Sequence, residues 1–196
     1  MLIQQIPVQR LVRSCLHLAL AANFLVASQF NFSLSDTAGK THTSGDLREH
    51  KATVFIFVAI DCPNSNTYAP VLARLYREYS QRGVAFYSVY SDPSENADAV
   101  RKHDTDYQVP FPALLDTHQT LARQAGARST PEAIILGPDG QELYRGRVDD
   151  RFVDFGKTRF HPTQDDLGEA LDAILQGKPA PHPVTKVLGC AIPGLN

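Results

Sequence analysis

The sequence lacks a strong excess of one charge: it has 19 basic and 21 acidic residues and no long run of either sign. Proteins that hold nucleic acid or an anionic membrane surface by charge carry a basic patch, so we expect neither partner. The chain also lacks an apolar run as long as the roughly 20 residues of a membrane span. We expect no span in the mature chain. The full sequence has 196 residues, a length that suits one well-cored domain.

The N-terminal segment has the layout of a secretory signal peptide. Arg10 and Arg13 precede an apolar stretch, residues 15–27, which ends in small side chains. We therefore expect residues 1–28 to direct export, and the mature protein to be periplasmic or secreted. An uncleaved interfacial anchor is the alternative interpretation of the same segment.

Cysteine is scarce, with three in the whole chain. Cys15 falls in the predicted signal peptide, which leaves Cys62 in the expected domain, residues 29–177, and Cys190 in a proline-rich tail, residues 178–196. Export would place both in a compartment that permits disulfides. Two cysteines are the minimum for an intramolecular redox pair, and they also fit a structural disulfide, so their number alone does not decide between these roles.

The spacing of apolar residues predicts an α/β fold. We expect two short N-terminal strands around a turn at 36–40, buried strands at 53–60 and 84–90, helices at 66–81, 95–107 and 117–126, a hairpin at 131–148 and a last helix ending at Gly177. A strand, a helix and a strand in succession predict a right-handed crossover. The prolines of the tail argue there against both helix and sheet.

Cys62 stands between the buried strand 53–60 and the helix that follows it. Open α/β sheets place their chemistry at this position. The positive end of the helix dipole and the unpaired N–H groups of its first turn would favour a thiolate, which is a nucleophile. Pro63 suits the first helical turn, whereas Pro70 lies inside the helix and is expected to kink it. An inert buried thiol is the alternative for Cys62.

The stretch AIDCPNSNTYAPVL, residues 59–72, resembles the active-site segment of the thioredoxin-like superfamily. In that family a strand ends at a cysteine, a C-x-x-C tetrad opens a helix, and an Ala-Pro pair eight residues after the first cysteine kinks it. Ala69 and Pro70 stand at that spacing from Cys62. The resemblance therefore implies that Cys62 is the nucleophile of a thiol-disulfide oxidoreductase.

A second motif extends this resemblance. Thr130 and Pro131, in GARSTPEAIIL, resemble the family's cis-proline, which would place them beside Cys62. The order of elements resembles the secreted redoxins of the alkyl hydroperoxide reductase, thiol-specific antioxidant and cytochrome-maturation (TlpA-like) type. The resemblance implies a thioredoxin-like fold with a central mixed sheet flanked by helices, an N-terminal β-hairpin extension and an irregular C-terminal tail.

The sequence departs from the family pattern at four positions. Ser65 stands where the tetrad has its second cysteine, and a hydroxyl cannot release a mixed disulfide. Ile56 replaces the buried acid of many thioredoxins. The peroxiredoxin motif P-x-x-x-T-x-x-C would need proline and threonine where the chain has Phe55 and Ala59. These departures argue against the usual thioredoxin mechanism and against fast turnover of peroxide.

We hypothesise that the tail folds back, so that Cys190 meets Cys62 and acts as the resolving thiol in place of Ser65. Thr130 and Pro131 would then form the substrate-facing loop. The residues expected to contact substrate are those that follow the nucleophile: Pro63, Asn64, Ser65 and Asn66. The expected partners are protein thiols or disulfides, with small peroxides as the alternative, and no cofactor is expected. A free thiol or a structural half-cystine is the alternative role for Cys190.

Two further function classes stay open. Copper chaperones on this fold bind Cu(I) through two thiolates and a histidine, and the two cysteines could supply the sulfurs. The C-x-x-x-C spacing of those chaperones is missing, because Asn66 stands at its second position. The candidate third ligands are His42, His103, His161 and His182. A non-catalytic docking module that uses the same groove is the other class.

The segment 145–160 packs charges and aromatics between a predicted strand and the last helix, and it is longer than a plain connection requires. Asp149, Asp150 and Arg151 in it are candidates for ordering the tail or contacting a partner. A solvated loop is the alternative.

Overall fold

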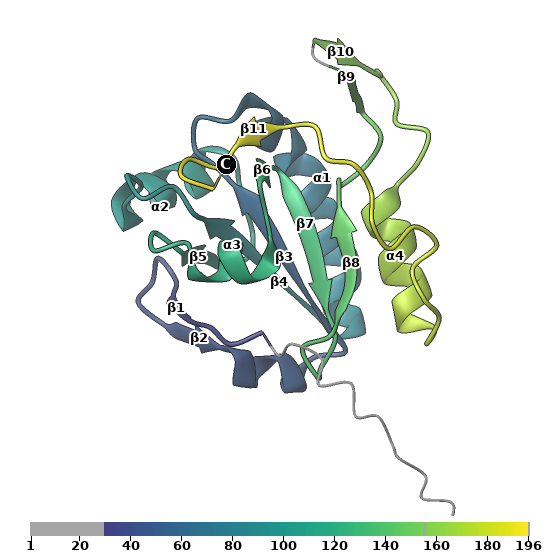
Figure 1. The fold of residues 1–196 in the computed structure, drawn as a ribbon, viewed down its shortest axis with the longest axis horizontal. Helices are drawn as coiled ribbons and strands as arrows, with labels where there is room; N and C mark the ends of the chain where they lie inside the picture. The colour runs from purple at the N-terminus through teal and green to yellow at the C-terminus, as the bar shows by residue number, and fades with distance from the viewer. Residues whose placement is uncertain (1–29, 155, 196) are drawn as a thin grey trace, which may run out of the picture.

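The computed structural model describes residues 30–154 and 156–195, and the predicted signal peptide therefore lies outside the described residues. A five-stranded sheet in the order β5-β4-β3-β7-β8 forms the centre of the molecule (Figure 1). Its strands are β3 (Ala52–Val58), β4 (Val84–Tyr90), β5 (Ala113–Leu115), β7 (Glu132–Leu136) and β8 (Glu142–Gly146). Strand β3 runs parallel to β4 and antiparallel to β7, so the sheet is mixed, as predicted.

Within the described residues, four α-helices and three two-stranded ladders surround this sheet. The helices are α1 (Pro63–Tyr79), α2 (Ala97–Asp106), α3 (Thr120–Ala125) and α4 (Asp166–Leu175), with 3₁₀ turns η1 (Ser44–Glu49) and η2 (Ser80–Arg82). The ladders pair β1 (Ser33–Ser35) with β2 (Thr41–Thr43), β9 (Phe152–Asp154) with β10 (Lys157–Thr158), and β6 (Ser129–Thr130) with β11 (Cys190–Ala191). Within the described ranges, none of the helices combines the length and apolar character needed to cross a bilayer.

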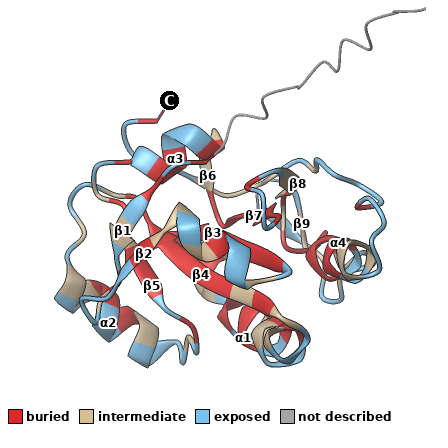
Figure 2. Cartoon of the chain, turned by 90° about the horizontal axis from the view of Figure 1, so that it is seen from below, coloured by how far each residue is buried: buried red, intermediate tan, exposed pale blue. Residues whose placement is uncertain are grey.

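Strand β3 is buried on both faces, as its uninterrupted apolar sequence predicts. Val54 and Ile56 pack into one core cluster with residues of α1 and α4, whereas Phe55 and Phe57 pack into a second cluster with residues of α3. Figure 2 shows the buried residues concentrated on the central strands and on the inner faces of the helices. Each such large apolar side chain contributes about 1.5–3 kcal/mol when fully buried, so these two layers hold β3 rigidly in place.

Helix α1 begins at the end of β3, three residues earlier than the predicted helix. Cys62 is the N-cap residue and Pro63 occupies the first helical turn, where its missing N–H costs nothing. Pro70 lies inside the helix. Gly83 follows η2 with a φ of 92°, a left-handed conformation that glycine adopts without steric cost. The strand-to-helix junction thus carries the candidate nucleophile.

The tail contradicts the expectation that its prolines exclude sheet. Strand β11 pairs antiparallel with β6, with Cys190 opposite Thr130. In Figure 1 the yellow C-terminal segment runs from α4 to β6. Ile192 and Leu195 are each 1% exposed and belong to the second core cluster. The prolines flank the short strand instead of falling within it, so they leave its N–H groups free to pair.

Two acidic residues, Asp149 and Asp150, order the segment 145–160. The Asp149 carboxylate accepts a hydrogen bond from the Tyr68 hydroxyl, and Asp150 accepts bonds from both the N–H and the hydroxyl of Thr163. Both carboxylates are about 5% exposed or less. These contacts join the segment to α1 and to the residues before α4.

Candidate functional site

The site is built around Cys62, at the junction of β3 and α1. Its residue is 1% exposed, and its backbone adopts an extended N-cap conformation with a carbonyl that accepts the N–H of Asn66 at 3.1 Å. The sulfur therefore lies at the positive end of α1, as the sequence predicts. The first turn of a helix has N–H groups without intrahelical partners, and these favour a negatively charged sulfur.

Thr130 lies directly against this sulfur. The Cys62 thiol donates a hydrogen bond to the Thr130 carbonyl oxygen at 3.1 Å, although the two residues are far apart in sequence. The Thr130–Pro131 peptide bond is cis. The structure therefore brings together the nucleophile and the Thr-Pro pair that the sequence resemblance places beside it.

Cys190 reaches the same point from the tail. Strand β11 sets it opposite Thr130, whose carbonyl oxygen is 3.1 Å from Cys62 Sγ, and each of the two thiols shifts the pKa of the other. Both cysteines are free thiols in this structure, Cys62 buried and Cys190 partly exposed. The two cysteines expected in the mature chain thus form one pair, which is the arrangement that the hypothesis of a folded-back tail requires.

The two thiols differ in acidity. Burial alone would raise the pKa of Cys62, but the polar groups of Cys190, Ser65 and Thr130 around its sulfur outweigh burial and hold that pKa below its ordinary value. Burial, together with donation to Cys62, raises the pKa of Cys190 to about 12. The hydroxyls of Ser65 and Thr130 are buried and have no hydrogen-bond partner within the described residues. Cys62 is therefore the more acidic thiol of the pair.

The tail approaches the site closely because residue 189 has no side chain. A Cβ added to Gly189 would stand 2.1 Å from the Thr130 carbonyl oxygen, which is far inside contact distance. The Asn64 side-chain amide donates to the carbonyl of Leu188 at 3.4 Å and holds the tail from the other side. The role of Gly189 was not predicted from the sequence, because its close contact is with a residue far away in the chain and nothing in the neighbouring residues indicates it.

The four residues expected to contact substrate separate into two kinds. Pro63 and Asn64 line a cleft of about 440 Å³ beside Cys190. Ser65 is 3% exposed and turned inward. The Asn66 side chain donates to the Ile60 carbonyl at 3.1 Å and contacts His103 Nε2 at 2.8 Å, so it braces the loop before Cys62.

The cleft lies between the first turn of α1, the β9–β10 ladder and the tail. Its lining residues are Pro63, Asn64, Phe152, Asp154, Gly156, Thr158, Leu188, Gly189 and Cys190. Cys190 is among them and Cys62 is not. The β9–β10 ladder was not predicted from the sequence, since its two short strands lack an apolar alternation of useful length.

A carboxyl group supports the loop that carries Cys62. Glu95 Oε1 accepts the Ile60 N–H at 2.9 Å, whereas its Oε2 is buried and has no hydrogen-bond partner within the described residues. Burial raises the pKa of Glu95 to about 7, and the nearby charges of Asp92 and Asp61 act in the same direction. The group is therefore poised to change its charge near neutral pH.

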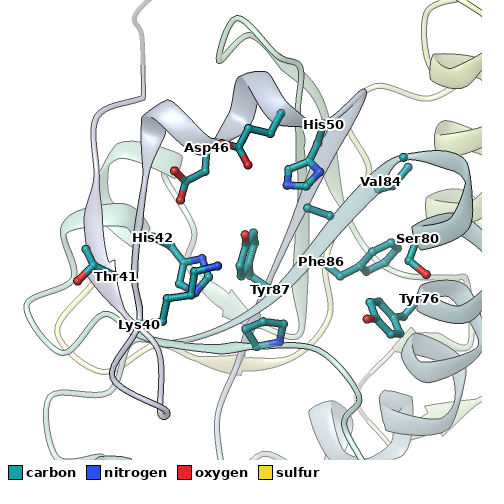
Figure 3. Close-up of a pocket in the computed structure, with 14 residues that line it drawn as sticks. Lys40, Thr41, His42, Asp46, His50, Tyr76, Ser80, Val84, Phe86 and Tyr87 are labelled. Atoms are coloured by element: carbon teal, nitrogen blue, oxygen red, sulfur yellow. The ribbon is translucent and has the colours of Figure 1, made fainter.

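Another pocket, of about 540 Å³, lies at the opposite end of the strands (Figure 3). Figure 3 shows His42, Asp46, His50 and Tyr87 around it, together with residues that begin β4. Cys62 follows the far end of β3, which is parallel to β4. Neither cysteine lines this pocket, so it is separate from the thiol pair.

The candidate copper ligands do not gather around the thiols. In the part of the chain that the structure describes, no three side chains of histidine, cysteine, aspartate or glutamate form a group that could hold a metal ion. His42 binds Asp36 at 2.9 Å, and His103 binds Tyr90 and Asn66. His161 and His182 are exposed. The geometry thus offers the two sulfurs no third ligand from these residues.

Comparisons with known proteins identify the family and the fold of the chain. Thiol-disulfide oxidoreductase ResA of Halalkalibacterium halodurans is 25% identical over 126 residues, which cover 63% of this chain and 70% of that protein. A solved structure from Sinorhizobium meliloti 1021, of a protein without an assigned function, is 28% identical with a TM-score of 0.74 and covers 83% of this chain and 90% of that one. The structure of MTB dsbF in mixed oxidised and reduced forms, 22% identical with a TM-score of 0.58 over 74% of this chain and 95% of that one, shows the shared fold. The AhpC/TSA family model matches residues 26–142, and the chain belongs to this family of thioredoxin-like redoxins.

Proposed function

We propose that the protein is an exported thiol-disulfide oxidoreductase in which Cys62 and Cys190 form a reversible disulfide. The general part of this statement, a thioredoxin-like redox enzyme that exchanges thiols and disulfides, is supported by the family and by the relative named for that activity. Protein thiols or disulfides are the corresponding partners. The finer part, the roles of the two cysteines, is supported by their geometry.

The observation that carries the proposal is that Thr130 places Cys190 beside Cys62, the more acidic of the two thiols. The Cys62 thiolate attacks one sulfur of a partner disulfide, which forms a mixed disulfide on Cys62 and releases the other partner sulfur as a thiolate. The Cys190 thiol then loses its proton and attacks Cys62 Sγ. This step forms the Cys62–Cys190 disulfide and releases the second partner sulfur as a thiolate. The chain is oxidised by two electrons and the partner disulfide is reduced.

The first step requires the tail to move. Cys62 is 1% exposed, and β11 occupies the edge of β6 where an extended partner chain would pair with Thr130. Release of β11 exposes both the sulfur and this edge. The tail then returns with Cys190 after the mixed disulfide has formed, and in the oxidised protein the disulfide holds it in place.

Export belongs to the proposal and is supported by the layout of residues 1–28. In an exported chain, periplasmic or secreted, the disulfide form can persist. Small peroxides are the alternative oxidant, but Phe55 and Ala59 occupy the positions of the peroxiredoxin proline and threonine. Cu(I) transfer lacks a third ligand among the described residues.

The test is peptide mapping without reductant, before and after mild oxidation and again after reduction. We expect a Cys62–Cys190 link that forms and disappears reversibly. A Cys15→Ser variant serves as the control that excludes pairing with the third cysteine. If Cys62 is instead capped by small thiols or linked between chains while Cys190 stays free, the proposal is wrong. A docking module would keep normal partner binding after Cys62→Ser, whereas an exchange enzyme would lose its mixed disulfide.

A further inference from the structure

The two sulfurs of the pair face different surroundings. Cys62 is 1% exposed and lies under the tail, whereas Cys190 is partly exposed and lines the cleft of about 440 Å³. In the proposed function, the tail leaves β6 in the reduced protein, whereas in the disulfide form it is tied covalently over Cys62. A molecule that reduces the disulfide therefore meets one accessible sulfur, and that sulfur belongs to Cys190.

From this arrangement, and resting on the proposed function, we infer that the cleft is the binding site of the reductant, a low-molecular-weight thiol that attacks Cys190. Oxidation and reduction then take place at different sulfurs. The oxidising partner reacts with Cys62 when the tail is released, and the reducing thiol reacts with Cys190 while the tail is in place. The cleft has no other assigned role.

The exchange steps balance. A thiolate RS⁻ attacks Cys190 Sγ, the Cys62–Cys190 bond breaks, and Cys62 leaves as a thiolate while RS–S–Cys190 forms. A second RS⁻ attacks the sulfur of the bound R group, which forms RSSR and releases Cys190 as a thiolate that takes up a proton. The protein gains two electrons and two thiols of the reductant are oxidised to one disulfide.

The acidity of the two groups favours the same direction of attack. Thiol-disulfide exchange is faster when the leaving sulfur has the lower pKa. Cys62 is that sulfur, because Ser65 and Thr130, which lie outside the tail, contribute to its lowered pKa and stay in place after Cys190 is modified. Attack on Cys62 would instead expel Cys190, whose pKa is raised by burial and by the neighbouring Cys62. Both the exposure of Cys190 and the stability of Cys62 as the leaving thiolate therefore favour attack on Cys190.

The size and lining of the cleft favour a small molecule. A volume of about 440 Å³ falls within the usual range for small-ligand sites. Phe152 and Leu188 supply apolar surface, and Asn64 and Thr158 supply polar groups. A polypeptide that bound as an extended strand would need the edge of β6, and β11 already occupies it. The alternative reductant is a protein thiol, and the test must distinguish it from a small thiol.

The experiment treats the oxidised protein, in a Cys15→Ser background, with glutathione as the probe. The reaction is stopped with acid at short times, free thiols are alkylated, and the adduct is located by peptide mapping and extrapolated to zero time. We expect glutathione on Cys190 and the alkyl group on Cys62. Initial adduct on Cys62 would overturn the inference and leave the proposed function intact, whereas failure to form the Cys62–Cys190 disulfide would overturn both.

A matched pair of variants tests the cleft itself. Thr158→Trp fills the cleft, whereas Val153→Trp adds the same side chain at an exposed position of the β9–β10 ladder that does not line it. We expect Thr158→Trp to slow reduction by glutathione several-fold and Val153→Trp to leave the rate unchanged. Equal rates for both variants would contradict the site. A dithiol protein that reduces the disulfide faster than glutathione, and equally well in both variants, would contradict the class of reductant.

Discussion

Cys190 lies opposite Thr130 in the antiparallel pairing of β11 with β6, and the Thr130 carbonyl is 3.1 Å from Cys62 Sγ. One residue of β6 therefore positions both thiols, one through the strand pair and the other through a hydrogen bond. The tail pairs with the edge of β6 in the way that an extended substrate chain would. In the proposed mechanism, the position of Thr130 couples the redox reaction to access to the site.

The effect of Cys190 on the pKa of Cys62 can be removed without removing the strand. In a Cys15→Ser background, Cys190→Ala deletes the donor, so the pKa of Cys62 should rise above that of the protein with Cys190 intact. Cys190→Ser keeps a hydroxyl donor and should preserve more of the lowered pKa. Ultraviolet absorbance of the thiolate as a function of pH measures both. The same pKa for the alanine and serine variants would show that Cys190 does not stabilise the thiolate.

Gly189→Ala should loosen the tail. The new Cβ would meet the Thr130 carbonyl oxygen at 2.1 Å, and a steric clash of this kind typically costs about 1–3 kcal/mol. Once β11 leaves β6, Cys190 is more exposed and its pKa falls toward the ordinary value, so alkylation of Cys190 should become about tenfold faster for each 1.4 kcal/mol lost. Mass spectrometry of timed alkylation measures this rate. Ala191→Ser, at an exposed position of the same strand, is the control, and equal rates in the two variants would refute the role of Gly189.

Glu95 should make stability depend on pH in a defined window. Its pKa is raised in the folded protein to about 7 from an ordinary value of 4.5, so between these values the folded state binds more protons than the unfolded state. The free energy of unfolding should therefore be highest below about pH 4.5 with respect to this group and should fall as the pH rises through about 7. The loss should be on the order of 1 to 2 kcal/mol, since Glu95 as a whole residue is only partly buried.

The matched variant for this prediction is Glu95→Gln, which keeps an oxygen to accept the Ile60 N–H but cannot ionise. Urea unfolding at about pH 5 and about pH 8 should show a smaller difference in the variant than in the original protein. If the two proteins lose the same free energy between these conditions, the dependence comes from other groups.

Tyr68→Phe should destabilise the segment that leads to α4. The Tyr68 hydroxyl donates to the buried carboxylate of Asp149, and removal of such a donor leaves a charged acceptor underpaired at a cost of about 1–3 kcal/mol. Denaturant unfolding measures the change. Tyr76→Phe is the control, because the Tyr76 hydroxyl has no hydrogen bond among the described residues, and its effect should stay within about 0.5 kcal/mol. Similar effects of both variants would argue against the contact with Asp149.

The central part of the fold was predictable because its signals are local. The β-branched and aromatic run of β3, the helical spacing of α1 and the turn at Gly83 each lie within a few residues, and each forms as expected. The short strand β5, with three residues, was missed. The expectation that the tail contains no strand was wrong, since nothing within the tail indicates that it would pair with β6 at Thr130.

By itself the sequence determined the position of Cys62 at a strand-to-helix junction, the absence of a second cysteine in the tetrad, and the existence of a second thiol in the tail. These features depend on residue type and short-range spacing, which a linear pattern records. Only the tertiary structure decided that Cys190 and Cys62 meet at Thr130, and that Cys190 lines a cleft while Cys62 is covered. It also decided that the tail approaches Thr130 so closely that residue 189 must lack a side chain. Those outcomes depend on the packing of Ile192 and Leu195 into the core and on strand pairing between distant residues, which are set by the whole fold and not by any segment of it.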